Sequence, residues 1–198
     1  MRPALRKLLL FGMPPIVAGA VTLILDQCTD TDGTPIASHA IGPTNVPATS
    51  WQSLTGTGVT IQSNKASTSG GVAELHVCDP GKADIDYSTD WTASGGQSGV
   101  ALRCTDASNY WRVWRGIGAT NINLDEVNAT VVTNRGTAAA SGNGTIRVVA
   151  SGATITVYWN GTSMFSYTSA TFNQGATKAG LRNNNSSATT WDNITMVG

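Results

Sequence analysis

Hydrophobic and polar residues alternate with a period of two in many short segments of this chain, which is the pattern of half-buried β-strands. The alternation is clearest from Ser98 to Arg115, where two such segments flank a connection rich in Asp, Ser and Asn. The short side chains of these residues bond to nearby backbone and support turns, so the stretch predicts a β-hairpin. Within it, we expect Trp111 and Val113 to face a hydrophobic core.

Further segments with this period follow one another at short spacing. They cover residues 21–26, 59–61, 72–78, 83–91, 120–127, 130–134, 145–150, 153–159, 163–167, 178–182 and 190–197. Asn160-Gly161 is the strongest hairpin signal, because both central residues of a type I′ turn need positive φ. About a dozen strands in one domain pack as two sheets. The sequence therefore predicts an all-β, two-sheet antiparallel sandwich over residues 21–198, with a long loop between residues 27 and 50.

The first 20 residues follow a different pattern, a basic start and then an uncharged apolar run. A signal peptide and a membrane span are two explanations of such a run, but two prolines in its middle disfavour a spanning helix. The third explanation, which we favour, is an extended apolar arm that docks against other proteins. Its expected docking residues are Leu8, Leu9, Leu10, Phe11, Met13, Pro14, Pro15, Ile16 and Val17.

Charge and cysteine content narrow the class of protein. The chain has 198 residues, with 12 Lys and Arg balanced by 12 Asp and Glu. Proteins that bind duplex nucleic acid need an excess of cationic side chains, so nucleic acid is not an expected partner. The odd number of cysteines does not suit a disulfide framework. Cys104 alternates with Val100 and Leu102, which predicts a small core residue, whereas pairing of Cys28 with Cys78 stays open.

The residue pattern disfavours an enzyme. Retaining glycosidases need two carboxylates about 5 Å apart, and Glu74 and Glu126, the chain's glutamates, lie in different segments. A serine nucleophile would need His39 or His76, but the G-x-S-x-G motif of the nucleophile elbow is missing. We therefore predict a non-enzymatic protein.

No metal or cofactor is expected either. Asp30 and Asp32 resemble the start of a calcium loop, but Ile41 stands where an EF-hand has its bidentate Glu, so a turn is the favoured interpretation. Glu74, His76 and Cys78 alternate on one strand. Residues two apart on a strand are about 6 to 7 Å from each other, so one strand seldom supplies three ligands to a zinc ion.

Several motifs resemble the concanavalin A-like (laminin G-like) jelly-roll sandwich. They are GVALR, NYW, TIRVVA, ITVYWNG, FNQG, AGLR and WDNITMV, in that order. The resemblance implies that the opening strand, around residues 23–28, lies beside the closing strand at 191–197. This fold hosts lectins, glycosidases, adhesion modules and virion proteins, so it does not decide the function. The apolar start LRKLLLFGMPP, followed by the DTDGT loop, is similar to minor tail or decoration proteins of phages that infect actinobacteria.

The leading hypothesis is a virion structural protein, a phage minor tail or capsid decoration subunit. It would be present in several copies, attached to other virion proteins by residues 1–20, and displaying the sandwich at the surface. The alternative is a secreted or cell-surface carbohydrate-binding module, and a glycoside hydrolase is less favoured. The first two hypotheses are compatible, because a virion surface module can bind host-surface glycans.

A glycan site is predicted on the hairpin, on the face opposite Leu102 and Trp111. Exposed aromatic rings stack on sugars and arginines bond to their hydroxyls. The residues expected to share this face are Arg103, Tyr110, Arg112 and Trp114. We call these four residues the hairpin stripe. The alternative is that the hairpin stripe has a structural role and packs beneath the loop from Gly33 to Ser50.

Overall fold

The computed structural model describes residues 20–42, 44–46, 49–95, 97–116, 118, 120–184 and 188–198. The predicted arm therefore lies outside the described residues except for Ala20, and its docking role stays a prediction. Among the described residues, none of the helical segments is both long and apolar enough to span a membrane.

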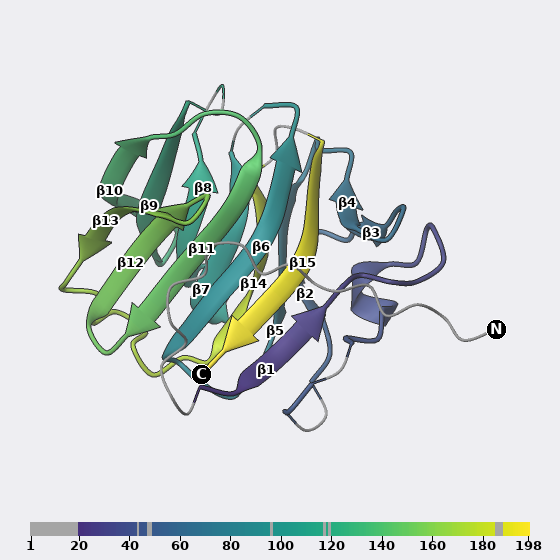
Figure 1. Ribbon diagram of the computed structural model, residues 1–198, viewed down its shortest axis with the longest axis horizontal. Coiled ribbons are helices and arrows are strands. Elements are labelled where there is room, and N and C mark those ends of the chain that lie inside the picture. Colours follow the sequence, from purple (N-terminus) through teal and green to yellow (C-terminus); the bar gives the residue numbers. More distant parts are fainter. Residues whose placement is uncertain are drawn as a thin grey trace.

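Two antiparallel sheets pack face to face and form the predicted all-β sandwich (Figure 1). The eight-stranded sheet has the order β13 (Thr162–Tyr167), β12 (Thr154–Trp159), β11 (Gly144–Ser151), β6 (Ile85–Ala93), β15 (Thr189–Val197), β4 (Ala66–Thr68) and β3 (Thr60–Ile61), with β1 (Thr22–Asp26) also paired with β15. The seven-stranded sheet has the order β10 (Val131–Ala139), β9 (Asn121–Asn128), β8 (Asn109–Arg115), β7 (Ser98–Asp106), β14 (Lys178–Asn184), β5 (Ala73–Cys78) and β2 (Gln52–Thr55). A short 3₁₀ helix, η1 (Ile36–Ser38), lies in the loop between β1 and β2.

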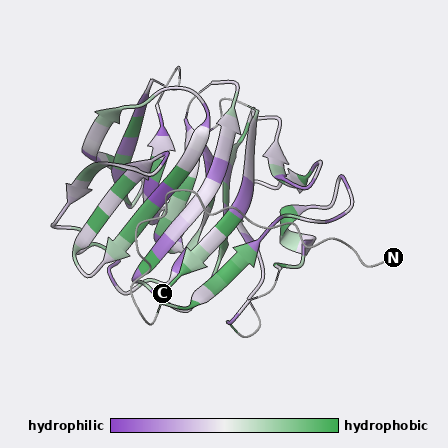
Figure 2. Cartoon of the chain, in the orientation of Figure 1, coloured by the Kyte–Doolittle hydropathy of each residue, from purple (hydrophilic) through white to green (hydrophobic). Residues whose placement is uncertain are grey.

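The core lies between the two sheets and takes one face of each strand. Hydrophobic and polar bands alternate along β11 and β12, as Figure 2 shows. The largest core side chains include four fully buried tryptophans, Trp51, Trp91, Trp111 and Trp191. The prediction that Trp111 faces the core is thus confirmed, with an exposed fraction of 0%.

Three local predictions are also confirmed. β7 and β8 form the expected hairpin, and the Asp106 carboxylate accepts a hydrogen bond of 2.7 Å from the backbone N–H of Ser108 in its turn. Asn160 and Gly161 have φ values of 49° and 79°, as a type I′ turn requires. The first strand lies beside the last, because β1 pairs with β15.

The position predicted for Cys104 is wrong. The pairing of β7 with β8 shifts between Leu102 and Asp106, and Arg103 adopts a φ of 49° at this bulge. Such a bulge reverses the side-chain alternation that follows it. Cys104 is buried as expected, but it packs with Leu75 and Tyr110 on the outer face of the sheet, not with Val100 and Leu102.

The strands β2 and β4 were not among the predicted segments, and the burial along β1 also departs from simple alternation. A register shift between Thr22 and Ile24 buries Leu23, Ile24 and Asp26 together. Asp26 is satisfied there because its carboxylate accepts hydrogen bonds from Trp51 Nε1 at 2.8 Å and from the backbone N–H of Cys28, also at 2.8 Å. The three cysteines are free thiols, so the pairing of Cys28 with Cys78 is not formed.

Candidate functional site

The outer face of the seven-stranded sheet, the one turned away from the core, carries three of the four predicted site residues. Tyr110, Arg112 and Trp114 alternate along β8, and the core-facing residues of this strand, such as Trp111 and Val113, lie between them. Tyr110 and Arg112 are buried by neighbouring side chains on the same face, whereas Trp114 is partly exposed.

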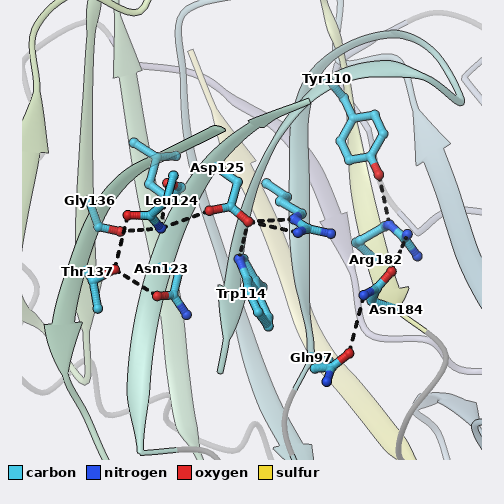
Figure 3. Close-up of polar contacts among 12 residues, drawn as sticks. Gln97, Tyr110, Trp114, Asn123, Leu124, Asp125, Gly136, Thr137, Arg182 and Asn184 are labelled. Atoms are coloured by element: carbon cyan, nitrogen blue, oxygen red, sulfur yellow. Dashed lines mark hydrogen bonds and ion pairs between the residues drawn. The ribbon is translucent and has the colours of Figure 1, made fainter. Parts of the chain in front are cut away.

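Asp125 on β9 joins two of these side chains. Antiparallel pairing puts Arg112 directly opposite Asp125. The Asp125 Oδ2 atom accepts hydrogen bonds from Arg112 Nε at 2.9 Å, Arg112 Nη2 at 2.8 Å and Trp114 Nε1 at 2.7 Å (Figure 3). The Arg112 Cζ atom also lies 4.9 Å from the centre of the Trp114 ring, which is a cation–π contact. We call Arg112, Trp114 and Asp125 the arginine–tryptophan cluster.

Two polar residues of β10 contact Asp125 and its outward neighbour on β9, Asn123. Asn134 Nδ2 donates to Asp125 Oδ1 at 2.9 Å, and the Thr137 hydroxyl donates to Asn123 Oδ1 at 2.9 Å. The ion pair itself is nearly closed to solvent, with 8% of the Arg112 side chain and 3% of the Asp125 side chain exposed. Asp125 and Arg112 therefore both contact the Trp114 indole, and Asn134 holds Asp125 from the other side.

Arg182 on β14 is the other cation near the centre of this face. Its Nε atom donates to the Tyr110 hydroxyl at 3.1 Å, and Nη1 donates to the carbonyl oxygens of Glu74 and Asn183. Its Nη2 atom donates to Asn184 Oδ1 at 3.0 Å, and Asn184 in turn contacts Gln97 (Figure 3). Arg182 is thus held in place by neutral partners.

Small residues on β7 lie between the arginine–tryptophan cluster and Arg182, so that both belong to one continuous surface. Gly99 and Ala101 face outward between β8 and β14, opposite Trp114 and Arg112. A Cβ atom at Gly99 would meet the Val113 carbonyl oxygen and lie only 2.8 Å from the Trp114 Cα atom. A glycine is therefore required here for the close approach of the strand that carries Trp114.

The prediction that Arg103 belongs to this face is wrong. The bulge at Arg103 sends its side chain to the loops at the end of the eight-stranded sheet, where it is 1% exposed. Its Nη1 atom donates to the Ala170 carbonyl at 2.9 Å, and Nη2 donates to the Gly152 carbonyl at 2.7 Å and to Asp84 at 3.1 Å. Arg103 thus joins β7 to the loops around Asp84, Gly152 and Ala170 at one end of the sandwich.

The structural alternative predicted that the hairpin stripe packs beneath the loop from Gly33 to Ser50. Instead, the backbone of this loop bonds to β1 and to the region of β3, for example from Ile36 N–H to the Val59 carbonyl at 3.0 Å. Tyr110 packs on its own sheet, in a cluster made of Leu75, Val77, Ala101, Cys104 and Val127. The hairpin stripe is therefore packed partly by its neighbours on the same face.

Sequence reasoning missed Asp125, Arg182 and the amide side chains that contact them. Asp125 could have been found from the predicted strands, because a charge pair opposite Arg112 is a common cross-strand pattern. Finding it requires the register of β8 against β9, which the turn between them does not reveal. Arg182 reaches Tyr110 from a strand 72 positions later, and the local pattern carries no signal for this contact.

Glu74 and His76 form a separate buried network on the core side of β5. His76 Nε2 lies 2.7 Å from Glu74 Oε2, and His76 Nδ1 lies 2.8 Å from the Ser53 hydroxyl. Burial lowers the pKa of His76, although its hydrogen bond to Glu74 opposes this shift. A neutral ring fits both contacts, with Nε2–H donating to Glu74 and Nδ1 accepting from Ser53.

The side chains considered for metal binding have other partners. Asp30 Oδ1 accepts a hydrogen bond from the Thr31 backbone at 2.7 Å, and Asp32 Oδ1 accepts one from the Ser63 backbone at 2.7 Å. The first contact is local to the loop, whereas the second joins the loop to the turn between β3 and β4. Within the described part of the chain, no group of three or more His, Cys, Asp and Glu side chains is placed to hold a metal ion.

Comparison with known proteins identifies the architecture. No protein-family model and no curated protein sequence matches this chain. Among solved structures, the carbohydrate binding module CBM66 from Bacillus subtilis is similar with a TM-score of 0.59 and 12% identity, over 75% of this chain and 95% of that one. The Bacillus licheniformis beta-glucanase has a TM-score of 0.53 and 11% identity, over 85% of this chain and 98% of that one.

The fold is a concanavalin A-like jelly-roll sandwich. A third similar structure, the GH43 BlXynB protein from Bacillus licheniformis, has a TM-score of 0.54 and 13% identity. The match covers 69% of this chain but only 33% of that protein. At these identities the likeness concerns the jelly-roll fold alone, and the function has to be argued from the outer face of the seven-stranded sheet.

Proposed function

We propose that this jelly-roll domain binds carbohydrate on the outer face of the seven-stranded sheet, with Trp114 and Arg112 in contact with the sugar. The arginine–tryptophan cluster is the observation that carries the proposal. A partly exposed indole, fixed by Asp125 and by a stacked guanidinium, is a preformed platform for a sugar ring. Because the ring is already ordered, binding costs little side-chain entropy.

The side chains on this face are suited to binding a sugar but not to cleaving one. Glycoside hydrolysis needs two carboxyl groups on either side of the scissile bond. On β8 and β9, the outward carboxylate is Asp125, which is engaged by Arg112, Trp114 and Asn134. A carboxylate held in this way is suited to positioning neighbours rather than to protonating a leaving group.

A glycan array tests the proposal. Folded wild-type protein, displayed multivalently, should give hits that are lost in Trp114→Ala and retained in part in Trp114→Phe, which keeps a ring but removes the bond to Asp125. Tyr158→Ala is the matched control, because Tyr158 carries a stacked arginine, Arg147, on the other sheet. An array without hits, or hits that survive in Trp114→Ala, would contradict the proposal.

We also propose that the domain is displayed in several copies on a virion surface and is attached to other virion proteins through residues 1–20. The position of Val21 supports this arrangement, because its backbone exchanges two hydrogen bonds of 3.0 Å with Gly198 beside β15. Val21 therefore lies at the eight-stranded sheet, on the opposite layer from the arginine–tryptophan cluster. Attachment at one layer would leave the other free for a host-surface glycan.

Reconstitution with the partner assembly tests the attachment. A chain that starts at Val21 should fold, because its strands are complete, but should not be incorporated. Incorporation of the shortened chain at the level of the full chain would show that attachment belongs to the sandwich. A secreted or cell-surface module remains the alternative setting for the same glycan-binding face.

A further inference from the structure

The balance of hydrogen-bond donors and acceptors on the outer face of the seven-stranded sheet is uneven. A neutral sugar hydroxyl both donates and accepts, so its site needs open acceptors as well as donors. On this face each acceptor oxygen near the arginine–tryptophan cluster already accepts at least one hydrogen bond. Asp125 Oδ2 accepts three hydrogen bonds and Oδ1 accepts one, and 3% of this side chain is exposed.

The amide oxygens around the cluster are engaged as well. Asn123 Oδ1 accepts from Thr137, Asn184 Oδ1 accepts from Arg182, and Gln97 Oε1 accepts from Asn184. The polar network of Figure 3 thus uses its acceptors to hold its own donors in place.

Donors, in contrast, are left over. Arg112 uses Nε and Nη2, so both hydrogens of Nη1 lack a partner among the described residues. The Nη1 atom is not among the buried nitrogens without a partner, and therefore it reaches solvent. On Arg182, one hydrogen of Nη2 is left after the bond to Asn184.

The charges on this face also favour an anionic ligand. The outward charged side chains of β5, β14, β7, β8 and β9 are Lys178, Arg182, Arg112, Asp125 and Asp106, and Asp106 lies at the exposed end of β7 in the hairpin turn. Asp125 neutralises Arg112, but Arg182 has no carboxylate within ion-pair distance among the described residues. The centre of the face therefore carries a fixed positive charge with spare N–H groups.

We propose that the ligand of this face is an acidic saccharide, one that bears a carboxylate or a sulfate, with its ring on Trp114 and its anionic group on the guanidinium groups of Arg112 and Arg182. An anion accepts hydrogen bonds and donates none, which matches the donors left over here. Guanidinium groups bind such anions in a planar, often bidentate geometry. This inference rests on the proposed carbohydrate binding and specifies the class of sugar.

Matched pairs of charged and neutral sugars test the inference by calorimetry. Sialyllactose is compared with lactose, and polygalacturonate with its fully methyl-esterified form, at about 150 mM salt, where screening acts over about 8 Å. A charge-assisted hydrogen bond contributes enough to make the charged member of each pair bind about tenfold or more tightly. Raising the salt concentration should weaken the charged member and leave the neutral one unchanged.

Two variants assign the effect to residues. Arg182→Gln should reduce the charged-to-neutral ratio to within about threefold, as expected when a charge-assisted bond becomes a neutral one, and Arg182→Lys should keep most of it. Arg147→Gln is the matched control, because Arg147 forms the corresponding arginine–aromatic pair with Tyr158 on the other sheet. If Arg182→Gln fails to fold, the wild-type ratio and its salt dependence still decide the inference.

The possible outcomes distinguish a failure of this inference from a failure of the proposed carbohydrate binding. Equal binding of the charged and neutral members, lost in Trp114→Ala, would keep carbohydrate binding and overturn the acidic preference. No binding of either member would overturn both. Equal affinity for polyglutamate and polygalacturonate would show unspecific attraction of polyanions and would also overturn the inference.

Discussion

Replacement of Asp125 by alanine should destabilise the protein far more than its place on an outer sheet face suggests. The carboxylate accepts hydrogen bonds from Arg112, Trp114 and Asn134, and its side chain is only 3% exposed. Removing one partner of a buried ion pair leaves the other charge without compensation, which costs about 3 to 5 kcal/mol. The change also leaves the Trp114 indole without its acceptor.

A double-mutant cycle measures how much of this cost comes from the pair. Arg112→Met removes the guanidinium but keeps a long apolar side chain. The double variant Arg112→Met, Asp125→Ala should be less destabilised than the sum of the single variants by about 2 kcal/mol, since the stranded charge is then removed too. Urea denaturation, followed by circular dichroism, gives the four free energies of unfolding.

Two results would refute this argument. If Asp125→Ala costs less than about 1 kcal/mol, the pair behaves as an exposed surface ion pair. If the two single changes add within about 0.5 kcal/mol, Arg112 and Asp125 are energetically independent. In either case the arginine–tryptophan cluster is not a preformed unit, and the platform proposed for the sugar has no fixed geometry.

Two further predictions concern the core. Trp111→Ala should cost about 3 to 5 kcal/mol in chemical denaturation, because the ring is fully buried, and a cost under about 1 kcal/mol would contradict the register of β8. Burial raises the pKa of Cys28 from 9.0 to about 12, so the folded state keeps a neutral thiol where the unfolded chain ionises. The stability that this group contributes is complete below pH 9 and is lost as the pH rises toward 12. Cys28→Ala should therefore reduce the fall in the free energy of unfolding between pH 8 and pH 10. An equal fall in the wild type and the variant would contradict this prediction.

The strands and the hairpin could be predicted from the sequence because their signals are local. The alternation along its own strand was enough to predict that Trp111 is buried. The Asn160-Gly161 pair was enough to predict the turn between β12 and β13. Arg103 could not be placed in this way. Its positive φ shifts the register of β7, and that conformation is held by the carbonyls of Gly152 and Ala170, which come from distant parts of the chain.

The candidate site was predictable only in part, for the same physical reason. Tyr110, Arg112 and Trp114 share a face because they alternate on one strand. The groups that fix them come from other strands, Asp125 from β9 and Arg182 from β14, and their positions depend on sheet order and register. Local periodicity describes which face a residue takes, whereas the contacts across the face are set by the topology.

The most direct test of the central claim is a two-dimensional NMR titration of the protein with a sugar that binds on the array, read at the indole N–H signals. Trp51, Trp91, Trp111 and Trp191 are fully buried and serve as internal references. We predict that the Trp114 indole signal, whose N–H donates to Asp125, shifts with the sugar together with amides of β8 and β14. Shifts confined to the eight-stranded sheet, with an unchanged Trp114 signal, would contradict it.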